Sequence, residues 1–558
     1  MLIKEFTSQS DAEAYIESNP QERPFVYYVT GVAKLFYDSF SGGGQSNYKQ
    51  VITSIIDGSS AGSIDIEEGI TKIRRFAFYQ CKGLTSISIP STVESIGASA
   101  FRECTELQSI EIPDTVTVYD GNTSGYMFNG NTSMVTCKYF NPSLLTAAFP
   151  TYEFNGCTAL TTLTLDGSTY TSIAAYAFQN CSSLTSPLNF PNVTTINSYA
   201  FNGCTHLNPT FGTSKISVVQ AGAFQNCKEL TSIDLSNVAA TGIHVRAFNG
   251  CSSLQSITIR EGVTTLPSYA FMGCSSLTSV TLPSTLTTAG FYNSNNTGDN
   301  DSGRRSVFAN CTSLTSFTLL STNCTAIPQY YLQNCTSLTN SGITIPDSIT
   351  TIQNYCFAGC TSLTKPVYRN DRTAHTSFGT YCFSGCTGIT SLDIPAGQTS
   401  FPSYIFNGCT GLTGNLTLPS NITSIGEGCF QGCTNITYFK ASEGFTSLGK
   451  KCFFNCSGLI TVDLPSTFTT FVAATSGAGT FQNCTSMTTL IIRATTPPAN
   501  LNAYTFQGIK TGGKIYVPKG SLATYQAVAG WYTTNSNYWP KKMGWTLNEL
   551  DANGNIPS

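Results

Sequence analysis

Apolar residues recur with a fixed spacing through most of the chain, and residues 81 to 104 show the unit clearly. From Cys81 onward, the apolar positions are Leu84, Ile87, Ile89, Val93, Ile96 and Phe101. The alternation of polar and apolar residues up to Ile89 predicts a short β-strand. Pro90 ends that strand because it has no N–H to donate to a neighbouring strand. A second short segment then runs back on another face, and Phe101 turns inward.

The same register returns along the chain, where a cysteine recurs about every 23 residues in most units. These repeat cysteines are Cys81, Cys104, Cys157, Cys181, Cys204, Cys227, Cys251, Cys274, Cys311, Cys335, Cys360, Cys386, Cys409, Cys433, Cys456 and Cys484. Asn131 and Ile509 stand at this position in two further units, which gives about eighteen turns. One turn cannot bury its own apolar side, whereas stacked turns cover one another. The pattern therefore predicts a mostly β solenoid.

The full repeat reads F-x-x-C-x-x-L-T-S-I-x-I-P-x-x-V-x-x-I-G-x-x-A-F. It resembles the BspA-type leucine-rich repeat, a variety found on bacterial and protozoan surface proteins. The resemblance covers roughly residues 60 to 530. It implies a leucine-rich repeat solenoid that serves as a scaffold for binding, and it names no ligand.

Departures from the repeat divide the chain into three predicted parts: a small N-terminal module (1–50), the solenoid (51–510) and a C-terminal cap (511–558). The segment PFVYYVTGVAKLFYDSF in the module predicts a hairpin around Thr30-Gly31. This stretch is loosely similar to N-terminal segments of structural proteins in phages of gut Bacteroidota. We expect the module either to cover the first turn, as solenoids require, or to anchor the chain to a particle.

The C-terminal part is expected to begin a helix at Ser521, with Leu522, Tyr525 and Val528 on one side. The three tryptophans of the chain follow, and they are Trp531, Trp539 and Trp545. They are expected to cover the last open turn. The alternative is that Trp531 and Trp539 form an exposed platform for a ligand.

Composition excludes several classes of function. The net charge is −3 and only 11% of residues are charged, so no basic surface for nucleic acid is expected. No apolar run approaches the roughly 18 residues that a transmembrane helix needs, so membrane insertion is not expected. The N-terminus lacks the apolar region of a secretory signal. We therefore expect that a signal has been removed or that the protein leaves its cell by another route.

The 22 cysteines are interpreted as buried thiols. Cysteines stacked at one register point in parallel, which is unsuitable for disulfides. Four Cys-x-x-x-Cys pairs resemble metal ligands, but their first cysteine stands where other repeats have alanine, so packing is the preferred interpretation. These pairs are Cys356/Cys360, Cys382/Cys386, Cys429/Cys433 and Cys452/Cys456.

Catalytic and metal chemistry is not predicted. The three histidines, His206, His244 and His375, stand at unrelated repeat positions, so they form no Ser-His-Asp or Cys-His set. Asp299 and Asp301 resemble the start of a calcium loop, but Asn310 stands where the bidentate glutamate belongs. The sequence thus predicts no enzyme, no cofactor and no metal.

Binding is predicted for the longest polar insertion, residues 293–305. Two arginines there could grip carboxylates or acidic sugars, and the amides and carboxylates add donors and acceptors. The candidate residues are Asn295, Asn296, Asp299, Asp301, Arg304 and Arg305. The alternative is a tolerated surface loop that binds nothing.

A second candidate surface is a polar stripe at the outward position of successive strands. Its members are Ser88, Glu111, Thr164, Asp234, Thr258, Thr281, Thr318, Asp393 and Asp463. Such a row could meet glycans or a protein groove. The alternative is ordinary solvation of strands in which threonine is favoured.

Two functions follow as hypotheses. The first is a non-enzymatic binding rod located on a phage virion, as a fibre or decoration protein. Its N-terminal module would contact other virion proteins, and its repeats would contact a protein or glycan of the host surface or mucus. The second is a cell-surface adhesin of a bacterium or protist, located outside the cell.

Overall fold

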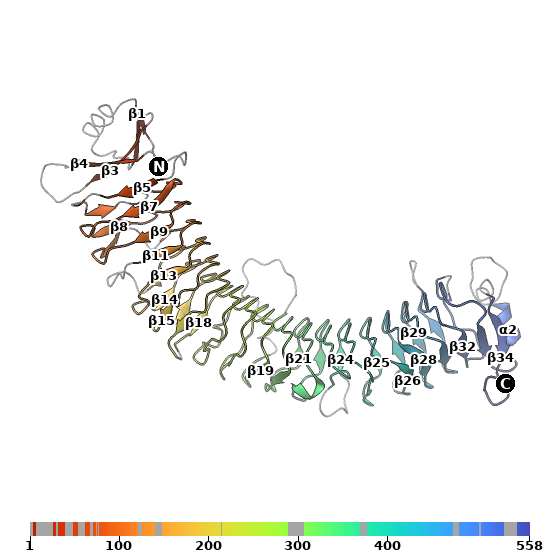
Figure 1. Ribbon diagram of the computed structural model, residues 1–558. Helices are drawn as coiled ribbons and strands as arrows, with labels where there is room; N and C mark the ends of the chain where they lie inside the picture. Colours follow the sequence, from red (N-terminus) through yellow and green to blue (C-terminus); the bar gives the residue numbers. More distant parts are fainter. Residues whose placement is uncertain are drawn as a thin grey trace. The chain divides into compact units, whose positions relative to one another are not determined.

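The computed structural model is mostly β and forms a parallel β-solenoid of about 17 turns, with almost no helix among the described residues. Figure 1 shows the succession of its turns. The chain divides into two compact units, Met1–Ser275 (unit 1) and Ser276–Ser558 (unit 2). Besides the backbone of four strands before residue 54, the structure describes residues 62–66, 68, 71–73, 75, 77–120, 125–139, 148–213, 215–287, 306–368, 376–472, 479–501, 504–528 and 544–557. The predicted solenoid is confirmed, with about one turn fewer than the sequence pattern suggested.

The first strands of unit 1 form a sheet of their own, in the order β1-β2-β3-β4. Their bounds are β1 (Lys4–Phe6), β2 (Val26–Val29), β3 (Val32–Asp38) and β4 (Tyr48–Thr53). Strands β2 and β3 pair antiparallel, which confirms the predicted hairpin. Strand β4 pairs with β3 and extends past residue 50, so the sheet continues beyond the predicted end of the N-terminal module.

The rest of unit 1 is a parallel coil, and each of its turns from β5 to β18 contributes strands to two sheets. One sheet contains β5 (Gly62–Asp65), β7 (Leu84–Ser88), β9 (Ser109–Glu111), β11 (Thr136–Lys138) and β13 (Thr162–Thr164). A second contains β6 (Lys72–Ile73), β8 (Ser95–Gly97) and β10 (Val118–Asp120). A third contains β12 (Ala148–Phe149), β14 (Ser172–Ile173), β16 (Thr195–Ile196) and β18 (Val218–Val219). A fourth contains β15 (Asn189–Phe190) and β17 (Thr210–Phe211). Strands β7 and β8 confirm the two segments expected around Pro90.

Unit 2 repeats this arrangement. Its first sheet contains β19 (Ser279–Leu282), β20 (Ser316–Leu319) and β22 (Ile343–Thr344). A second contains β21 (Ala326–Ile327), β23 (Thr351–Ile352) and β24 (Ser377–Phe378). A third contains β25 (Ser400–Phe401), β27 (Ser424–Ile425), β29 (Ser447–Leu448) and β31 (Thr470–Phe471). The longest sheet contains β26 (Gly414–Leu418), β28 (Ile436–Ala441), β30 (Thr461–Leu464), β32 (Thr489–Ile492), β33 (Lys514–Val517) and β34 (Thr546–Glu549). Thus β33 and β34, beyond residue 510, continue the sheet of the repeats.

The C-terminal helix α2 (Leu522–Ala527) begins after Ser521, as expected. Tyr525 is buried, and its hydroxyl donates a hydrogen bond to the carbonyl of Ala494 at 2.8 Å. Val528, expected on the same side, is exposed, so the buried side of the helix is narrower than predicted. Trp545 is buried against Phe506, as a residue covering the last turn should be.

The core of each unit is a column of stacked phenylalanine rings, one per turn. Phe101 has no exposed surface, and its ring centroid lies 5.3 Å from that of Phe78 and 5.9 Å from that of Phe128. The stacking continues to Phe271 in unit 1 and runs from Phe357 to Phe506 in unit 2. Each turn therefore covers the apolar side of the next.

The cysteines lie buried beside this column, as predicted. In most of the repeat cysteines Sγ also donates to a backbone carbonyl of the preceding turn, usually that of its phenylalanine. Cys227, for example, donates to Phe201 at 3.0 Å, and Cys104 to Phe78 at 3.0 Å. The first cysteine of each pair that resembles a metal site, such as Cys356, is fully buried. Burial raises the pKa of the Cys386 and Cys433 thiols to about 12.

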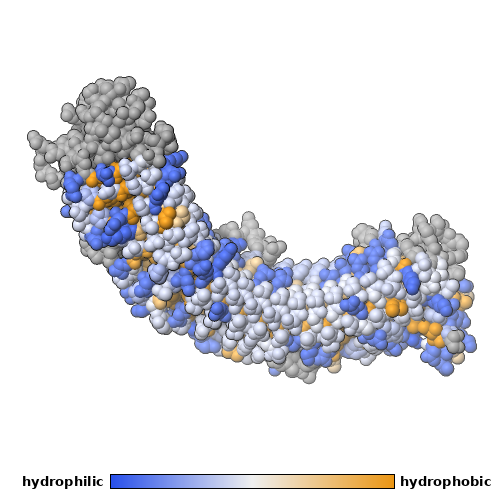
Figure 2. Space-filling view, viewed as in Figure 1, coloured by the Kyte–Doolittle hydropathy of each residue, from blue (hydrophilic) through white to orange (hydrophobic). Residues whose placement is uncertain are grey.

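The surface is weakly polar. Figure 2 shows that much of the visible face has intermediate hydropathy. This agrees with the small charged fraction of 11% and with the many exposed serines and threonines.

Replacing Phe201 with alanine should destabilise unit 1 locally by about 3–5 kcal/mol, because it leaves a cavity in the column. Phe201 stacks on Phe178 at 5.2 Å and on Phe224 at 5.3 Å. In a stacked array this loss should separate the turns on either side into two cooperative units. Hydrogen exchange should show faster opening in those turns. Unchanged exchange there, with a single unchanged melting transition, would contradict the column.

Stability should fall steeply at alkaline pH. In the folded protein the thiols of Cys386 and Cys433 stay protonated up to about pH 12, whereas in the unfolded chain they ionise near their ordinary pKa of 9.0. Their contribution is therefore complete below pH 9 and is lost as the pH rises toward 12, by about 1.36 kcal/mol per pH unit for each thiol. Chemical denaturation across this window measures the slope. The double variant Cys386→Ala/Cys433→Ala should show a shallower slope; an identical slope would refute the assignment.

Candidate functional site

In unit 2 the strands β19, β20 and β22 form one sheet, and β26, β28, β30, β32, β33 and β34 form a later one. Along the chain, these two sheets are separated by an interruption of two turns, which contain residues 363–368 and 389–394. Strand β22 ends one sheet and β26 begins the next. Pro366, at the strand position of the first turn, has no N–H to donate. In the second turn, Asp393 has a φ of +43°, which is not a strand conformation. These two turns therefore pass the outer face without forming strands.

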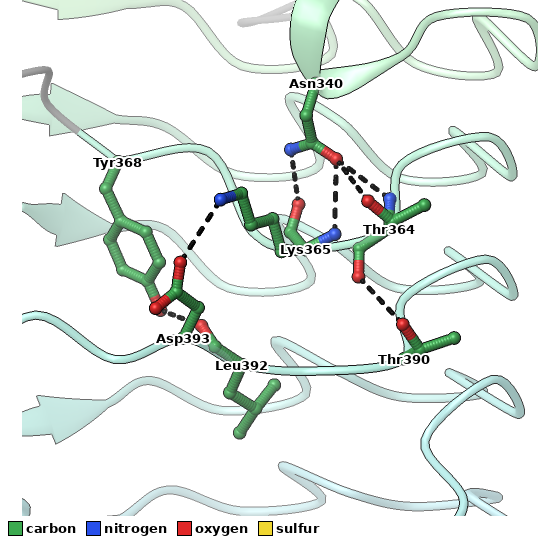
Figure 3. Close-up of polar contacts among 7 residues, drawn as sticks. All are labelled: Asn340, Thr364, Lys365, Tyr368, Thr390, Leu392 and Asp393. Atoms are coloured by element: carbon green, nitrogen blue, oxygen red, sulfur yellow. Dashed lines mark hydrogen bonds and ion pairs between the residues drawn. The ribbon is translucent and has the colours of Figure 1, made fainter.

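Side chains take over the hydrogen bonds that a strand would make. The Asn340 amide oxygen accepts from the backbone N–H groups of Thr364 (2.9 Å) and Lys365 (3.2 Å), and its amide nitrogen donates to the Lys365 carbonyl at 2.8 Å (Figure 3). One turn further on, the Tyr368 hydroxyl donates to the Leu392 carbonyl at 3.0 Å. Side chains of Asn340 and Tyr368 therefore replace part of the strand pairing in these two turns.

An ion pair crosses the interruption. The Lys365 ammonium nitrogen lies 3.2 Å from a carboxylate oxygen of Asp393 (Figure 3). Both side chains are more than two-fifths exposed, so water screens the pair and its contribution is below about 1 kcal/mol. Its main effect is to hold the two turns in register.

A cleft of about 240 Å³ lies between the segment Thr390–Ile394 and strand β26. Its floor is apolar and its rim is polar. The floor consists of the buried side chains of Leu392, Leu412, Leu416 and Ile436. The rim consists of the exposed Thr390, Ser391, Asp393, Thr413, Asn415 and Thr417. Because β26 is an edge strand among the described strands, it also presents backbone groups without a strand partner on this side.

The lining groups can make hydrogen bonds to a ligand. The lining residues include hydroxyls, one amide and one carboxylate, and Asp393 is already paired with Lys365. A second carboxylate or a histidine, which general acid–base chemistry would use, is not among the lining residues. The cleft can therefore hold a small ligand through hydrogen bonds and apolar contact.

Sequence comparison places the repeats in a known family. The sequence model of the BspA type leucine rich repeat region, in six copies, matches residues 49–185, 124–237, 171–298, 304–413 and 376–512. This chain belongs to the BspA-type leucine-rich repeat family.

Solved leucine-rich repeat structures are similar to this BspA-type chain. One is a leucine-rich repeat protein from Bacteroides ovatus, at 20% identity over 92% of this chain and 98% of that one, with a TM-score of 0.30. Another is a leucine rich cell surface protein from Faecalibacterium prausnitzii, at 19% identity over 84% and 95%, with a TM-score of 0.33. A third is the pneumococcal vaccine antigen PcpA, at 13% identity over 90% and 95%, with a TM-score of 0.20. The curated proteins compared include no match.

The candidate binding residues from the sequence lie outside the residues that the structure describes. They are Asn295, Asn296, Asp299, Asp301, Arg304, Arg305, Trp531 and Trp539. Their role in binding stays a prediction, as does the interpretation of Asp299 and Asp301 as an incomplete calcium loop. Among the described residues there is no group of three or more His, Cys, Asp or Glu that could hold a metal ion. None of the described helices is long and apolar enough to cross a membrane.

The polar stripe of the BspA-type repeats is exposed over much of its length, including Ser88, Thr164 and Thr281. Asp463 departs from the pattern, because only 2% of its surface is exposed. The Arg493 guanidinium donates to both of its carboxylate oxygens, at 2.7 and 3.0 Å. Arg493 also donates to the Gly554 carbonyl at 2.9 Å, so the C-terminal segment covers the stripe there. Asp463 is therefore structural, whereas Asp393 belongs to the cleft.

Sequence reasoning missed the cleft, although one signal was present. The insertion at residues 365–377 begins with Lys365-Pro366, which places a proline at a strand position. That pattern indicates a break in the sheet. The side chains that satisfy the break come from neighbouring turns, and their spacing in the sequence does not reveal them.

Replacing Asn340 with alanine should loosen the segment before Tyr368. The amides of Thr364 and Lys365 would lose their acceptor, at about 1 kcal/mol for each hydrogen bond. Hydrogen exchange at these two amides should accelerate roughly tenfold or more. Asn340→Asp keeps the accepting oxygen and is the control, which should retain most of the protection. Equal exchange in both variants would show that Asn340 does not hold this segment.

Proposed function

We propose that this BspA-type protein is a non-enzymatic binding protein, and that its cleft holds a neutral sugar residue of a surface glycan. The observation that carries this proposal is the polar rim over an apolar floor between Thr390–Ile394 and β26. A pyranose ring has hydroxyls around its edge and C–H groups on its faces. The rim hydroxyls and the Asn415 amide can hydrogen-bond to the hydroxyls of the sugar, and the apolar floor can contact its C–H groups.

The size of the cleft supports one sugar unit of a longer chain. Its volume of about 240 Å³ is below the range of about 300–1,000 Å³ for pockets that enclose a drug-sized molecule. A glycan could place one residue in the cleft and continue over the exposed threonines of the neighbouring turns. The insertion at residues 293–305 and the pair Trp531 and Trp539 are proposed as further contacts with the same partner.

We propose that the protein attaches the particle or cell that carries it to a glycan-bearing surface. The carrier is either a phage particle or a bacterial or protist cell. On a phage particle, the four-stranded sheet β1–β4 would dock to other virion proteins, and its separation from the sheets of the coil supports such a module. On a bacterial or protist cell, the same binding surface would serve an adhesin. Mass spectrometry of purified virions, set against surface proteolysis of intact cells, separates the two locations.

A glycan array tests the binding proposal. The double variant Asn415→Ala/Thr417→Ala removes two exposed rim groups from β26 and should weaken binding at least about tenfold. Thr446→Ala, at an exposed residue directly before β29 that belongs neither to the cleft lining nor to the polar stripe, is the matched control and should bind like the unmodified protein.

Two results would count against the cleft. One is a double variant that binds the same glycans with unchanged affinity while remaining folded. The other is a loss of binding only when residues 293–305 are replaced by a short Gly-Ser turn, which would move the site to the insertion. An array with no bound glycan at all would favour a protein ligand.

A further inference from the structure

Four tyrosines in successive turns of unit 2 form a stacked ladder on the surface. Tyr330, Tyr355, Tyr381 and Tyr404 each stand two residues before the inward position of their turn and are half-buried. Neighbouring ring centroids lie 4.8, 4.7 and 4.5 Å apart, and the rings are within 7° of parallel. Their backbone φ values of 56° to 58° are left-handed, a conformation that residues other than glycine rarely adopt. The glycan-binding proposal makes no use of this ladder.

The ladder ends at a proton acceptor. The Tyr404 hydroxyl donates to a carboxylate oxygen of Glu427 at 2.5 Å. The Lys450 ammonium nitrogen lies 3.2 Å from the other carboxylate oxygen of Glu427. In the next turn the tyrosine position is Gly428, where a Cβ would lie 2.2 Å from the Tyr404 ring. Burial and the hydrogen bond to Glu427 raise the pKa of Tyr404, so its phenol stays protonated at neutral pH.

We propose that this ladder is a one-electron oxidation relay whose radical forms at Tyr404, with Glu427 as the base that takes the phenolic proton. A one-electron oxidant, such as a metal-based photo-oxidant or a peroxidase intermediate, removes one electron from a ladder ring. The electron vacancy left on that ring then moves along the ladder, because each stacked tyrosine can pass an electron to its oxidised neighbour. At Tyr404 the O–H bond breaks, the proton passes to the Glu427 carboxylate, and a neutral tyrosyl radical remains. The products are one radical, one protonated Glu427 and the reduced oxidant.

The chemical reason for Tyr404 is the acidity of an oxidised phenol. Loss of an electron makes the phenol a strong acid, so oxidation is far easier where a base lies within hydrogen-bond reach. At Tyr404 that base is in place before oxidation begins. Cys356 and Cys386 in this unit have raised pKa values and no exposed surface, so they offer little of the reactive thiolate to the same oxidant. The tyrosine ladder is therefore the group that a one-electron oxidant in solution oxidises on this face.

Unit 1 contains a second ladder that serves as an internal control. Tyr126, Tyr152, Tyr176 and Tyr199 stack at 4.8, 4.6 and 5.3 Å, and this ladder also ends at a glycine, Gly222. The residue at the position of Glu427, however, is alanine, Ala221. At the other end of this ladder, the Arg102 guanidinium lies 5.2 Å from the Tyr126 ring, and its positive charge disfavours a vacancy there. The two ladders differ in the base and share the stacking.

The experiment uses the full chain, a ruthenium trisbipyridine photo-oxidant with persulfate, and a nitroxide spin trap. Trapped residues are located by peptide mass spectrometry. We expect trapping at Tyr404 to exceed trapping at Tyr199 at least about tenfold, and Glu427→Gln to abolish this excess. Glu427→Asp, which keeps a carboxylate, should restore part of it. The melting temperature of each variant shows that the unit is folded.

A gain of function makes the test independent of any effect on unit 2. Ala221→Glu places a carboxylate beside Tyr199 and should raise trapping at that residue about tenfold. Equal trapping at Tyr404 and Tyr199 in the unmodified protein would overturn the proposal. So would an unchanged Tyr404 signal in a folded Glu427→Gln variant.

Discussion

The stacking of one phenylalanine on the next is the interaction on which each unit depends. A turn of about 23 residues is too small to enclose a core, and Phe201 is buried only because Phe178 and Phe224 lie on either side of it. The cysteines beside the column obey the same constraint. Each must be small and apolar, and most of the repeat thiols, such as that of Cys227, donate to a carbonyl in the preceding turn. A buried row of this kind leaves the outer face of each turn free for other uses.

Backbone pairing between turns is the second constraint, and the candidate cleft arises where it is relaxed. In most turns the outward segment is a parallel strand, so its polar backbone groups are already used. At Pro366 and Asp393 the strand is lost, and the side chains of Asn340 and Tyr368 replace part of the pairing. The edge of β26 is left beside an apolar floor. A regular scaffold thus gains a distinct site through a local defect, without any change to its core.

The fold could be predicted well from the sequence because the same spacing of inward apolar residues recurs in many repeats. The strand at Leu84–Ser88, the inward Phe101 and the buried Cys81 were all evident from spacing alone. The hairpin at β2 and β3 followed from local turn chemistry. The cleft and the tyrosine ladder were less accessible. They depend on contacts between residues one turn apart, such as Tyr404 with Glu427, and on a left-handed backbone that tyrosine rarely adopts. The burial of Asp463 was missed for the same reason, since its partner Arg493 lies in another turn.

Hydrogen exchange of the full chain, with and without a bound glycan, tests the central claim that the interrupted sheet is the binding site. The account predicts that glycan protects the amides of residues 390–394 and 414–418, whose segments border the cleft. The amides of β19, which already pair with β20, should exchange as before. Protection confined to residues 293–305, or bound glycan with no protection at residues 414–418, would contradict it.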